Sequence, residues 1–193
     1  MLTNNLTFDS AGHEYKLNGR PLPTVSQIVR LITGDTYAGI PKHILNNAAE
    51  FGTAVHKSIE LYNETFIIKY TDDFKMAYCL SQWVKLRPKF DDIIENEIMV
   101  HYRDLFAGTF DSIAIKDGEL ILIDYKTTSR FYRENVTIQL NLYRIAYEWM
   151  TGKKVRRLAA VWLPKDRPGK IEYLAILDDD ELLNTVEAVL KGV

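Results

Sequence analysis

The segment from Gly108 to Thr128, GTFDSIAIKDGELILIDYKTT, constrains the fold of this chain more than any other stretch. Two runs with alternating apolar residues, FDSIAI and ELILIDYK, flank a short polar turn that ends in Gly118. A glycine at the end of a short turn between such runs is typical of a β-hairpin. We therefore predict that this segment forms two antiparallel strands.

The predicted hairpin carries two aspartates and a lysine that strand geometry brings together. Because side chains alternate between the faces of a strand, Asp124 and Lys126 project from one face. Ile123 and Tyr125 project from the other face. Pairing of the strands can bring Asp111 opposite the Asp124 end of its partner. We expect two carboxylates and one ammonium group to lie close to one another.

Half-buried carboxylates at such a spacing raise each other's pKa unless a cation lies between them. Oxygen ligands suit Mg²⁺ or Mn²⁺, and a bound divalent ion lowers the pKa of water toward neutrality. Lys126 would then orient or deprotonate the water, or neutralise charge that develops on a phosphate. The alternative is that Asp111 ends a strand, and that Asp124 and Lys126 form an ordinary ion pair on a solvated face.

The length and composition of the chain fit a single domain. It has 193 residues, of which 47% are hydrophobic, enough to build one core. Its start lacks the basic and apolar segments of a signal peptide, and no apolar run approaches membrane-spanning length, so we expect a cytoplasmic protein without membrane contacts. The only cysteine, Cys79, excludes internal disulfides and metal clusters made of cysteines.

The charge of the chain is unevenly distributed. The net charge is -2, but from Lys126 to Lys170 eleven Lys and Arg residues stand against three acids. This segment therefore carries +8 and the remainder carries -10. A basic segment directly after the candidate site suits binding of a polyanion. Ordinary solvated surfaces would produce the same count.

The remaining patterns predict an α/β fold with a mixed central sheet of about four or five strands flanked by helices. A small N-terminal β-hairpin is predicted from 13–17 and 20–23, joined by Asn18-Gly19. Thr24 is expected to cap a short amphipathic helix. Further helices are predicted at 41–64, 71–86, 135–150 and from 179, and further strands at 91–102, 155–163 and 170–177. The expected domain 1–193 thus has an N-terminal part, 1–40, and a core, 41–193.

The predicted helix 41–64 places Gly52, His56 and Glu60 on one face, with Thr53 beside them. An interior glycine costs about 1 kcal/mol relative to alanine, and close approach of another backbone is one reason to keep it. We expect this face to lie over the sheet. His56 would then add an imidazole ligand, which favours Mn²⁺ or another transition ion. The alternative for His56 is a partly buried core position.

Three further residues are candidates for the same site. Glu97 lies in an apolar run and needs a partner there, so it either binds metal or is an ordinary edge-strand glutamate. Gln139 and Tyr143 share one face of a predicted helix. Their amide and phenol groups can hydrogen-bond a phosphate or a base, and tyrosine can stack on a base. The alternative for Tyr143 is core packing.

Five motifs occur in one order along the chain: G-T-x-x-H at 52–56, Glu97, G-x-x-D at 108–111, I-D-Y-K-T at 123–127 and Q-x-x-x-Y at 139–143. Together they resemble the PD-(D/E)XK nuclease superfamily, in particular its RecB-like branch. That branch includes helicase-linked nucleases, CRISPR-adaptation nucleases and single-strand exonucleases. The chain departs from relatives with a four-cysteine iron-sulfur cluster, and it lacks the G-x-x-x-x-G-K-[ST] motif of an ATP motor.

The resemblance implies a set of roles for the residues of this chain. His56, Asp111, Asp124 and the Tyr125 backbone carbonyl would bind Mg²⁺ or Mn²⁺, and Lys126 would be the catalytic lysine. Glu60 and Glu97 are candidates for further contacts to the metal. The predicted DNA-binding residues are Gln139, Tyr143, Arg130, Arg133 and Arg144.

The function predicted in this way is metal-dependent hydrolysis of DNA phosphodiester bonds. We expect an exonuclease of a phage or mobile element that acts in recombination, repair or replication in the bacterial cytoplasm. A helicase or a single-strand-annealing protein, encoded separately, would be its partner. The alternatives are a non-cleaving DNA-binding subunit of a recombination complex, an endonuclease of the same superfamily, and a hydrolase of another phosphoester.

Overall fold

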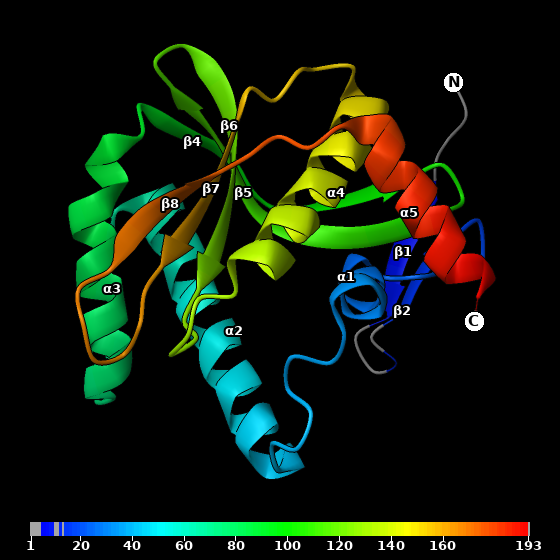
Figure 1. Cartoon of the computed structure of the whole chain (residues 1–193). Helices are drawn as coiled ribbons and strands as arrows, with labels where there is room; N and C mark the ends of the chain where they lie inside the picture. The colour runs from blue at the N-terminus through cyan, green and yellow to red at the C-terminus, as the bar shows by residue number, and fades with distance from the viewer. Residues whose placement is uncertain (1–4, 10–11, 13, 193) are drawn as a thin grey trace.

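The structure, a computed structural model, describes residues 5–9, 12 and 14–192 of the chain. Helices cover both faces of a five-stranded mixed sheet, and a three-stranded antiparallel sheet lies beside it (Figure 1). This arrangement confirms the predicted α/β class, with a mixed central sheet flanked by helices and a small N-terminal β unit.

The strands of the central sheet follow the chain order. They are β4 (Asp92–Tyr102), β5 (Phe106–Lys116), β6 (Glu119–Lys126), β7 (Arg157–Trp162) and β8 (Lys170–Leu174). All neighbouring pairs are antiparallel except β6 and β7, which are parallel and therefore need a helical crossover. The predicted hairpin is β5 and β6, and Asp117 and Gly118 in its turn have φ of 53° and 76°. Two positive φ angles are typical of a type I′ turn.

The helices divide between the two faces of the sheet. On one face lie α2 (Lys42–Thr65) and α3 (Phe74–Leu86), and on the other lie α1 (Val25–Thr33), α4 (Arg133–Thr151) and α5 (Asp179–Lys191). The two buried apolar clusters alternate along β6, since Leu122 belongs to one cluster and Ile121 and Ile123 to the other. The strand that carries Asp124 and Lys126 is therefore packed on both sides.

Helix α3 begins later than its predicted start at 71. The Asp73 carboxylate accepts hydrogen bonds from the backbone N–H groups of Lys75 and Met76, so the first helical residue is Phe74. The apolar pattern could not show this boundary, because it depends on which polar residue caps the helix. A short 3₁₀ helix, Arg87–Lys89, follows α3.

The N-terminal sheet consists of β1 (Leu6–Asp9), β2 (Glu14–Leu17) and β3 (Arg20–Leu22). The predicted hairpin is confirmed as β2 and β3, although His13 lies outside the described residues. Strand β1 was not predicted, because its four residues are too short for a clear pattern. The sheet packs on β5 through Tyr15 and Ala107, and the Tyr15 hydroxyl lies 2.8 Å from the Thr109 hydroxyl.

The predicted cap of α1 is present and joins this helix to the sheet. Thr24 and Gln27 form a reciprocal capping box, and Thr24 also forms a bridge to Ala107 of β5. Helix α1 and the loop after it are therefore fixed beside the central strands. Within the described part of the chain, the structure contains no helix with the length and apolarity that crossing a membrane requires.

Candidate active site

Most of the predicted site residues line one cavity of about 450 Å³. The cavity lies at the ends of β5 and β6, between α2, α4 and the N-terminal sheet. The predicted residues in its wall are His56, Glu60, Glu97, Asp111, Asp124, Lys126, Gln139 and Tyr143. The fold therefore brings together residues that are separated by up to about half of the chain.

The two aspartates lie opposite each other at the open end of the hairpin. The last pair in the ladder is Ser112 and Ile123, so the next residues along are Asp111 and Asp124. The Tyr125 backbone N–H donates to Asp111 Oδ2 over 2.6 Å. The predicted carbonyl contact of Tyr125 stays a prediction. Local strand pairing is thus sufficient to place both carboxylates on one face.

His56 of α2 contacts Asp111, with 2.9 Å between Nδ1 and Oδ1. Burial disfavours the imidazolium form, but the Asp111 carboxylate more than offsets this, and the pKa of His56 is raised. Burial likewise opposes ionisation of Asp111, but His56 holds the pKa of this carboxyl below its usual value. The two side chains therefore form a partly buried contact that shifts both pKa values in favour of the charged forms.

The glycine one turn before His56 does not have the close backbone neighbour that its position suggested. A Cβ atom at Gly52 would lie 3.5 Å from the Thr127 side-chain oxygen, which is an ordinary contact distance. Gly52 therefore faces the side chain of Thr127, directly after β6. The structure leaves room for an alanine at position 52.

The pKa of Asp124 is shifted in the opposite direction to that of Asp111. Asp124 is only 4% exposed, and burial together with the Asp111 carboxylate raises the pKa of Asp124, although Lys126 opposes this. The expectation that close carboxylates raise each other's pKa unless a cation lies between them describes Asp124, whereas cationic neighbours prevail at Asp111. The reason is that His56 contacts Asp111 directly, whereas its effect on Asp124 is outweighed by burial and by the Asp111 carboxylate.

Lys126 joins the hairpin to helix α4. Its Nζ lies 2.7 Å from Asp124 Oδ2 and donates to Gln139 Oε1 over 2.9 Å. Burial lowers the pKa of the ammonium group, but the Asp124 carboxylate outweighs this effect, and the pKa of Lys126 is raised. Lys126 is therefore a cation at neutral pH in this arrangement.

Tyr143 both lines the cavity and packs in the core. Its ring belongs to a buried cluster, and Gln139 Nε2 donates to its hydroxyl over 3.5 Å. Burial raises the pKa of Tyr143 far above its usual value, so the phenol is protonated. A Cβ atom at Gly108 would lie 2.7 Å from Tyr143 Cε1, which explains why this position of β5 suits glycine. Core packing of the Tyr143 ring is thus compatible with a role for its hydroxyl group in the cavity.

Glu97 and Glu60 complete the acidic side of the cavity. Glu97 lies across from Asp111, between the pairs Asn96–Ser112 and Ile98–Phe110, and its φ is 51°. A left-handed backbone at a residue other than glycine costs free energy and is often found at functional sites. Partial burial and the carboxylates of Asp111 and Glu60 raise the pKa of Glu97. Both glutamates therefore face the aspartates.

The donor groups of this cavity fit a hard divalent cation. No three His, Cys, Asp or Glu side chains among the described residues are arranged as a ready metal cluster. His56, Tyr125 and Lys126 instead hold the two aspartates. Asp124 Oδ2 is buried and lacks a hydrogen bond of acceptable geometry within the described structure, in spite of its contact with Lys126. A cation would satisfy this oxygen, and carboxylates with an imidazole suit Mg²⁺ or Mn²⁺.

A buried polar network lies under the aspartates, on the opposite face of β6. The Tyr125 hydroxyl lies 3.1 Å from Ser112 Oγ and accepts a hydrogen bond of 3.2 Å from Asn63. Asn63 also accepts from the Trp83 indole, and Asn96 accepts from both Asn63 and Ser112. The network fixes the part of β6 whose backbone holds Asp111. The sequence pattern did not assign these residues, although polar groups within apolar elements were a signal.

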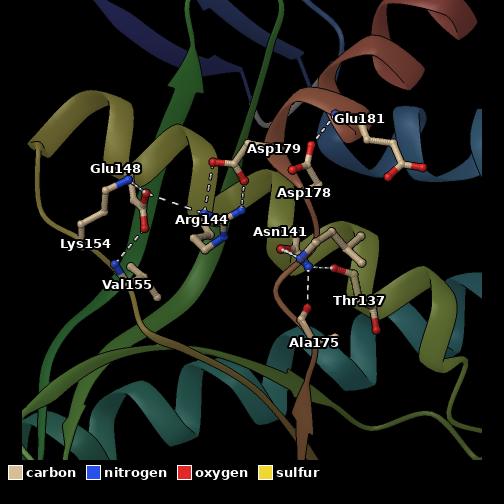
Figure 2. Close-up of polar contacts among 11 residues, drawn as sticks. Thr137, Asn141, Arg144, Glu148, Lys154, Val155, Ala175, Asp178, Asp179 and Glu181 are labelled. Carbon is tan, nitrogen blue, oxygen red and sulfur yellow. Dashed lines mark hydrogen bonds and ion pairs between the residues drawn. The ribbon is translucent and has the colours of Figure 1, made fainter.

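The structure places Arg144 away from the cavity. Its side chain is 5% exposed and forms ion pairs with Glu148 of α4 and Asp179 of α5 (Figure 2). Figure 2 also shows Glu148 bound to Lys154 and to the backbone of Val155. The prediction that Arg144 binds DNA does not agree with this placement, because its guanidinium is buried and already paired. Arg144 instead links α4 to α5.

The other two predicted arginines differ from each other in their contacts. Arg133 pairs with Glu172 of β8, whereas Arg130 lies over the Tyr132 ring, 5.1 Å from its centre, and joins none of the ion pairs of the described residues. Seven of the eleven basic residues between Lys126 and Lys170 form ion pairs. The basic excess of this segment is therefore largely balanced within the protein.

One comparison with a solved structure agrees with this fold. A solved structure from Eubacterium rectale, assigned as an exonuclease, has a TM-score of 0.50 and 12% identity, covering 85% of this chain and 76% of that chain. An alkaline exonuclease from Laribacter hongkongensis has a TM-score of 0.41 and 12% identity, covering 88% and 86%. No curated protein matches the sequence.

The family comparison reaches most of the candidate site. The model of the PD-(D/E)XK nuclease superfamily matches residues 74–192, more than half of the chain. The matched part includes the hairpin with Asp111, Asp124 and Lys126, and the helix with Gln139 and Tyr143. The chain belongs to the PD-(D/E)XK nuclease superfamily.

Proposed function

We propose that this protein is an exonuclease that hydrolyses DNA phosphodiester bonds with the help of Mg²⁺ or Mn²⁺. The observation that carries the proposal is the convergence of Asp111, Asp124 and Lys126 at the wall of one cavity, in a member of a nuclease superfamily. A binding protein that does not cut would gain nothing from clustered carboxylates beside a phosphate, because they repel it.

The residues that would hold the cation are Asp111, Asp124 and His56, together with the Tyr125 carbonyl. Glu60 and Glu97 would contribute further carboxylates from the acidic side of the cavity. When bound, the cation would supply Lewis-acid stabilisation of the negative charge on the phosphoryl oxygens.

Lys126 would stabilise charge on the attacked phosphate. Its raised pKa makes it a poor base near neutral pH, so the arrangement favours charge stabilisation over removal of a proton from water. Gln139 orients the ammonium group through the hydrogen bond to its Oε1. An ammonium group that is already in position stabilises the developing negative charge more strongly than one that must first reorganise.

Three residues are the remaining candidates for contacts to DNA. Gln139 and Tyr143 present an amide and a phenol to the cavity, and Arg130 lies on the segment after β6, over the Tyr132 ring. The amide and the guanidinium can donate to phosphate oxygens. We place this activity on DNA in the cytoplasm of a bacterium or a phage-infected host, with a separately encoded helicase or annealing protein as partner.

Attack at a strand end is favoured by the way the cavity is closed. Phe8 and Tyr15 of the N-terminal sheet line its wall on one side. A strand that runs through the site would have to pass this wall, whereas a strand end need not. This argument favours an exonuclease over an endonuclease of the same superfamily.

The test is digestion of end-labelled linear DNA and of circular DNA with Mg²⁺, Mn²⁺ or a chelator. We expect loss of terminal nucleotides from linear DNA with either metal, no cleavage of circles, and no reaction with chelator. Cleavage of circles would show an endonuclease instead. DNA binding without any cleavage would show the non-cleaving subunit.

Replacement of His56 by glutamine is expected to raise the metal concentration needed for half-maximal cleavage by ~10-fold or more. The imidazole would be lost as a ligand, and Asp111 would lose its cationic partner. A titration of cleavage rate against Mn²⁺ measures the change. The matched control is His43→Gln, an exposed position of the same helix. An unchanged titration would remove His56 from the ligand set.

A further inference from the structure

A second cavity, of about 540 Å³, adjoins the candidate active site. Thr24, Ser26, Lys126 and Gln139 line both cavities, so the second begins where the first ends. It lies between the end of α1, the loop after it and the start of α4. Its volume is within the range of about 300–1,000 Å³ that is usual for small-molecule sites. The proposed nuclease reaction leaves this space without a role.

Two tyrosines form an aromatic pair in the wall of the second cavity. The rings of Tyr37 and Tyr132 meet edge to face, with 5.9 Å between their centres and 79° between their planes. Tyr37 is 42% exposed, which leaves ring surface free for another aromatic group. Arg130 covers the Tyr132 ring. Aromatic rings of this kind are the platforms on which proteins stack single-stranded bases.

The loop that carries Tyr37 is tied to helix α4. Asn135 donates from its amide to the hydroxyl groups of Thr33 and Thr36, over 2.8 and 2.9 Å. The Tyr37 backbone N–H donates to Asp35 Oδ1. Because the loop is held in place before any ligand binds, little conformational entropy would be lost on binding.

Tyr37 lines the same cavity as Lys126 of the candidate active site. A group bound on Tyr37 would therefore be next to the lysine. The remaining wall is mixed, since Val29 and Val136 are apolar whereas Ser26 and Arg30 can hydrogen-bond.

We propose that Tyr37 and Tyr132 form a subsite for one unpaired nucleobase, next to the phosphate that would lie at Lys126. The base face would stack on Tyr37, whose ring Tyr132 supports edge to face. The polar edge of the base would meet Ser26, and Arg30 would contact a neighbouring phosphate. Because a base in a duplex is paired and stacked, the subsite selects single-stranded DNA. This inference rests on the proposed nuclease function and names the substrate class of the same site.

The first test measures binding of labelled single-stranded DNA by fluorescence anisotropy, in a chelator that prevents cleavage. Tyr37→Ala and Tyr132→Ala are each expected to weaken binding by about tenfold, the size of one lost base stack. Tyr37→Phe, which keeps the ring, retains more affinity than Tyr37→Ala. The matched control is Tyr173→Ala, an exposed tyrosine of β8, which binds as the wild type does.

The second test scans an abasic nucleotide along the single strand. At one position the abasic nucleotide is expected to weaken binding to the wild type by about tenfold and to cause no further loss in Tyr37→Ala. If the losses from the abasic nucleotide and from Tyr37→Ala add at every position, the subsite proposal is overturned. It is also overturned if the wild type cuts DNA and both alanine variants bind DNA with wild-type affinity. Failure of the wild type to bind or cut any DNA would overturn the nuclease proposal and the subsite together.

Discussion

Replacement of Asp124 by asparagine is expected to reduce DNA cleavage by at least ~10³-fold, which corresponds to about 4 kcal/mol of transition-state stabilisation. The exchange keeps the shape of a side chain that is 4% exposed, but it removes the charge. The proposed cation would lose a carboxylate ligand. Lys126 would lose the partner that keeps its ammonium group in position.

Cleavage of end-labelled linear DNA and thermal unfolding, measured on the same preparations, check this prediction. Asp166→Asn is the matched control, because this surface carboxylate pairs only with its neighbour Arg167 among the described residues. Lys126→Met, which removes the ammonium group from the same pair, is expected to abolish cleavage as well. Cleavage by Asp124→Asn within tenfold of the wild type would contradict the assignment of Asp124.

Replacement of Arg144 by alanine is expected to lower the free energy of unfolding by about 3 kcal/mol, the lower end of the cost of breaking a buried ion pair. Glu148, whose side chain is 9% exposed, would keep only Lys154 as a cationic partner. The link from α4 to Asp179 of α5 would also be lost (Figure 2). For a chain of this length, the midpoint of thermal unfolding would fall by about 6–12 °C.

The control for this change is Arg167→Ala, which breaks an exposed ion pair worth at most about 1 kcal/mol. At a temperature where Arg144→Ala is folded, we expect it to bind DNA as tightly as the wild type. Weaker DNA binding at unchanged stability would show that Arg144 contacts DNA after all.

Contacts between helices and strands decide several properties of the site residues that no local sequence pattern predicts. The sequence placed His56 and Glu60 on one helix face, but only packing of α2 against the sheet brought His56 to Asp111. That contact, with the hydrogen bond from the Tyr125 backbone, lowers the pKa of Asp111, whereas burial and the Asp111 carboxylate raise the pKa of Asp124. The left-handed backbone of Glu97 is likewise not indicated by residue order, and it occurs where β4 and β5 keep the same register on both sides of this residue.

The basic segment shows why charge counts alone can mislead. Arg144 and Arg130 contribute equally to the excess between Lys126 and Lys170. In the fold, however, Arg144 is buried between α4 and α5, whereas Arg130 lies on the segment beside the second cavity. Whether an arginine faces solvent depends on the packing of whole helices, which residue order does not specify.

The sequence by itself determined the hairpin, the shared face of Asp124 and Lys126, and the position of Asp111 across from them. Each of these follows from strand alternation and from a short turn, which act over a few residues. Only the tertiary structure decided which groups hold these carboxylates, where the basic residues face, and that Tyr37 and Lys126 line one cavity. The physical reason is that backbone geometry is set locally, whereas burial and the neighbours of a charge depend on segments far apart in the chain.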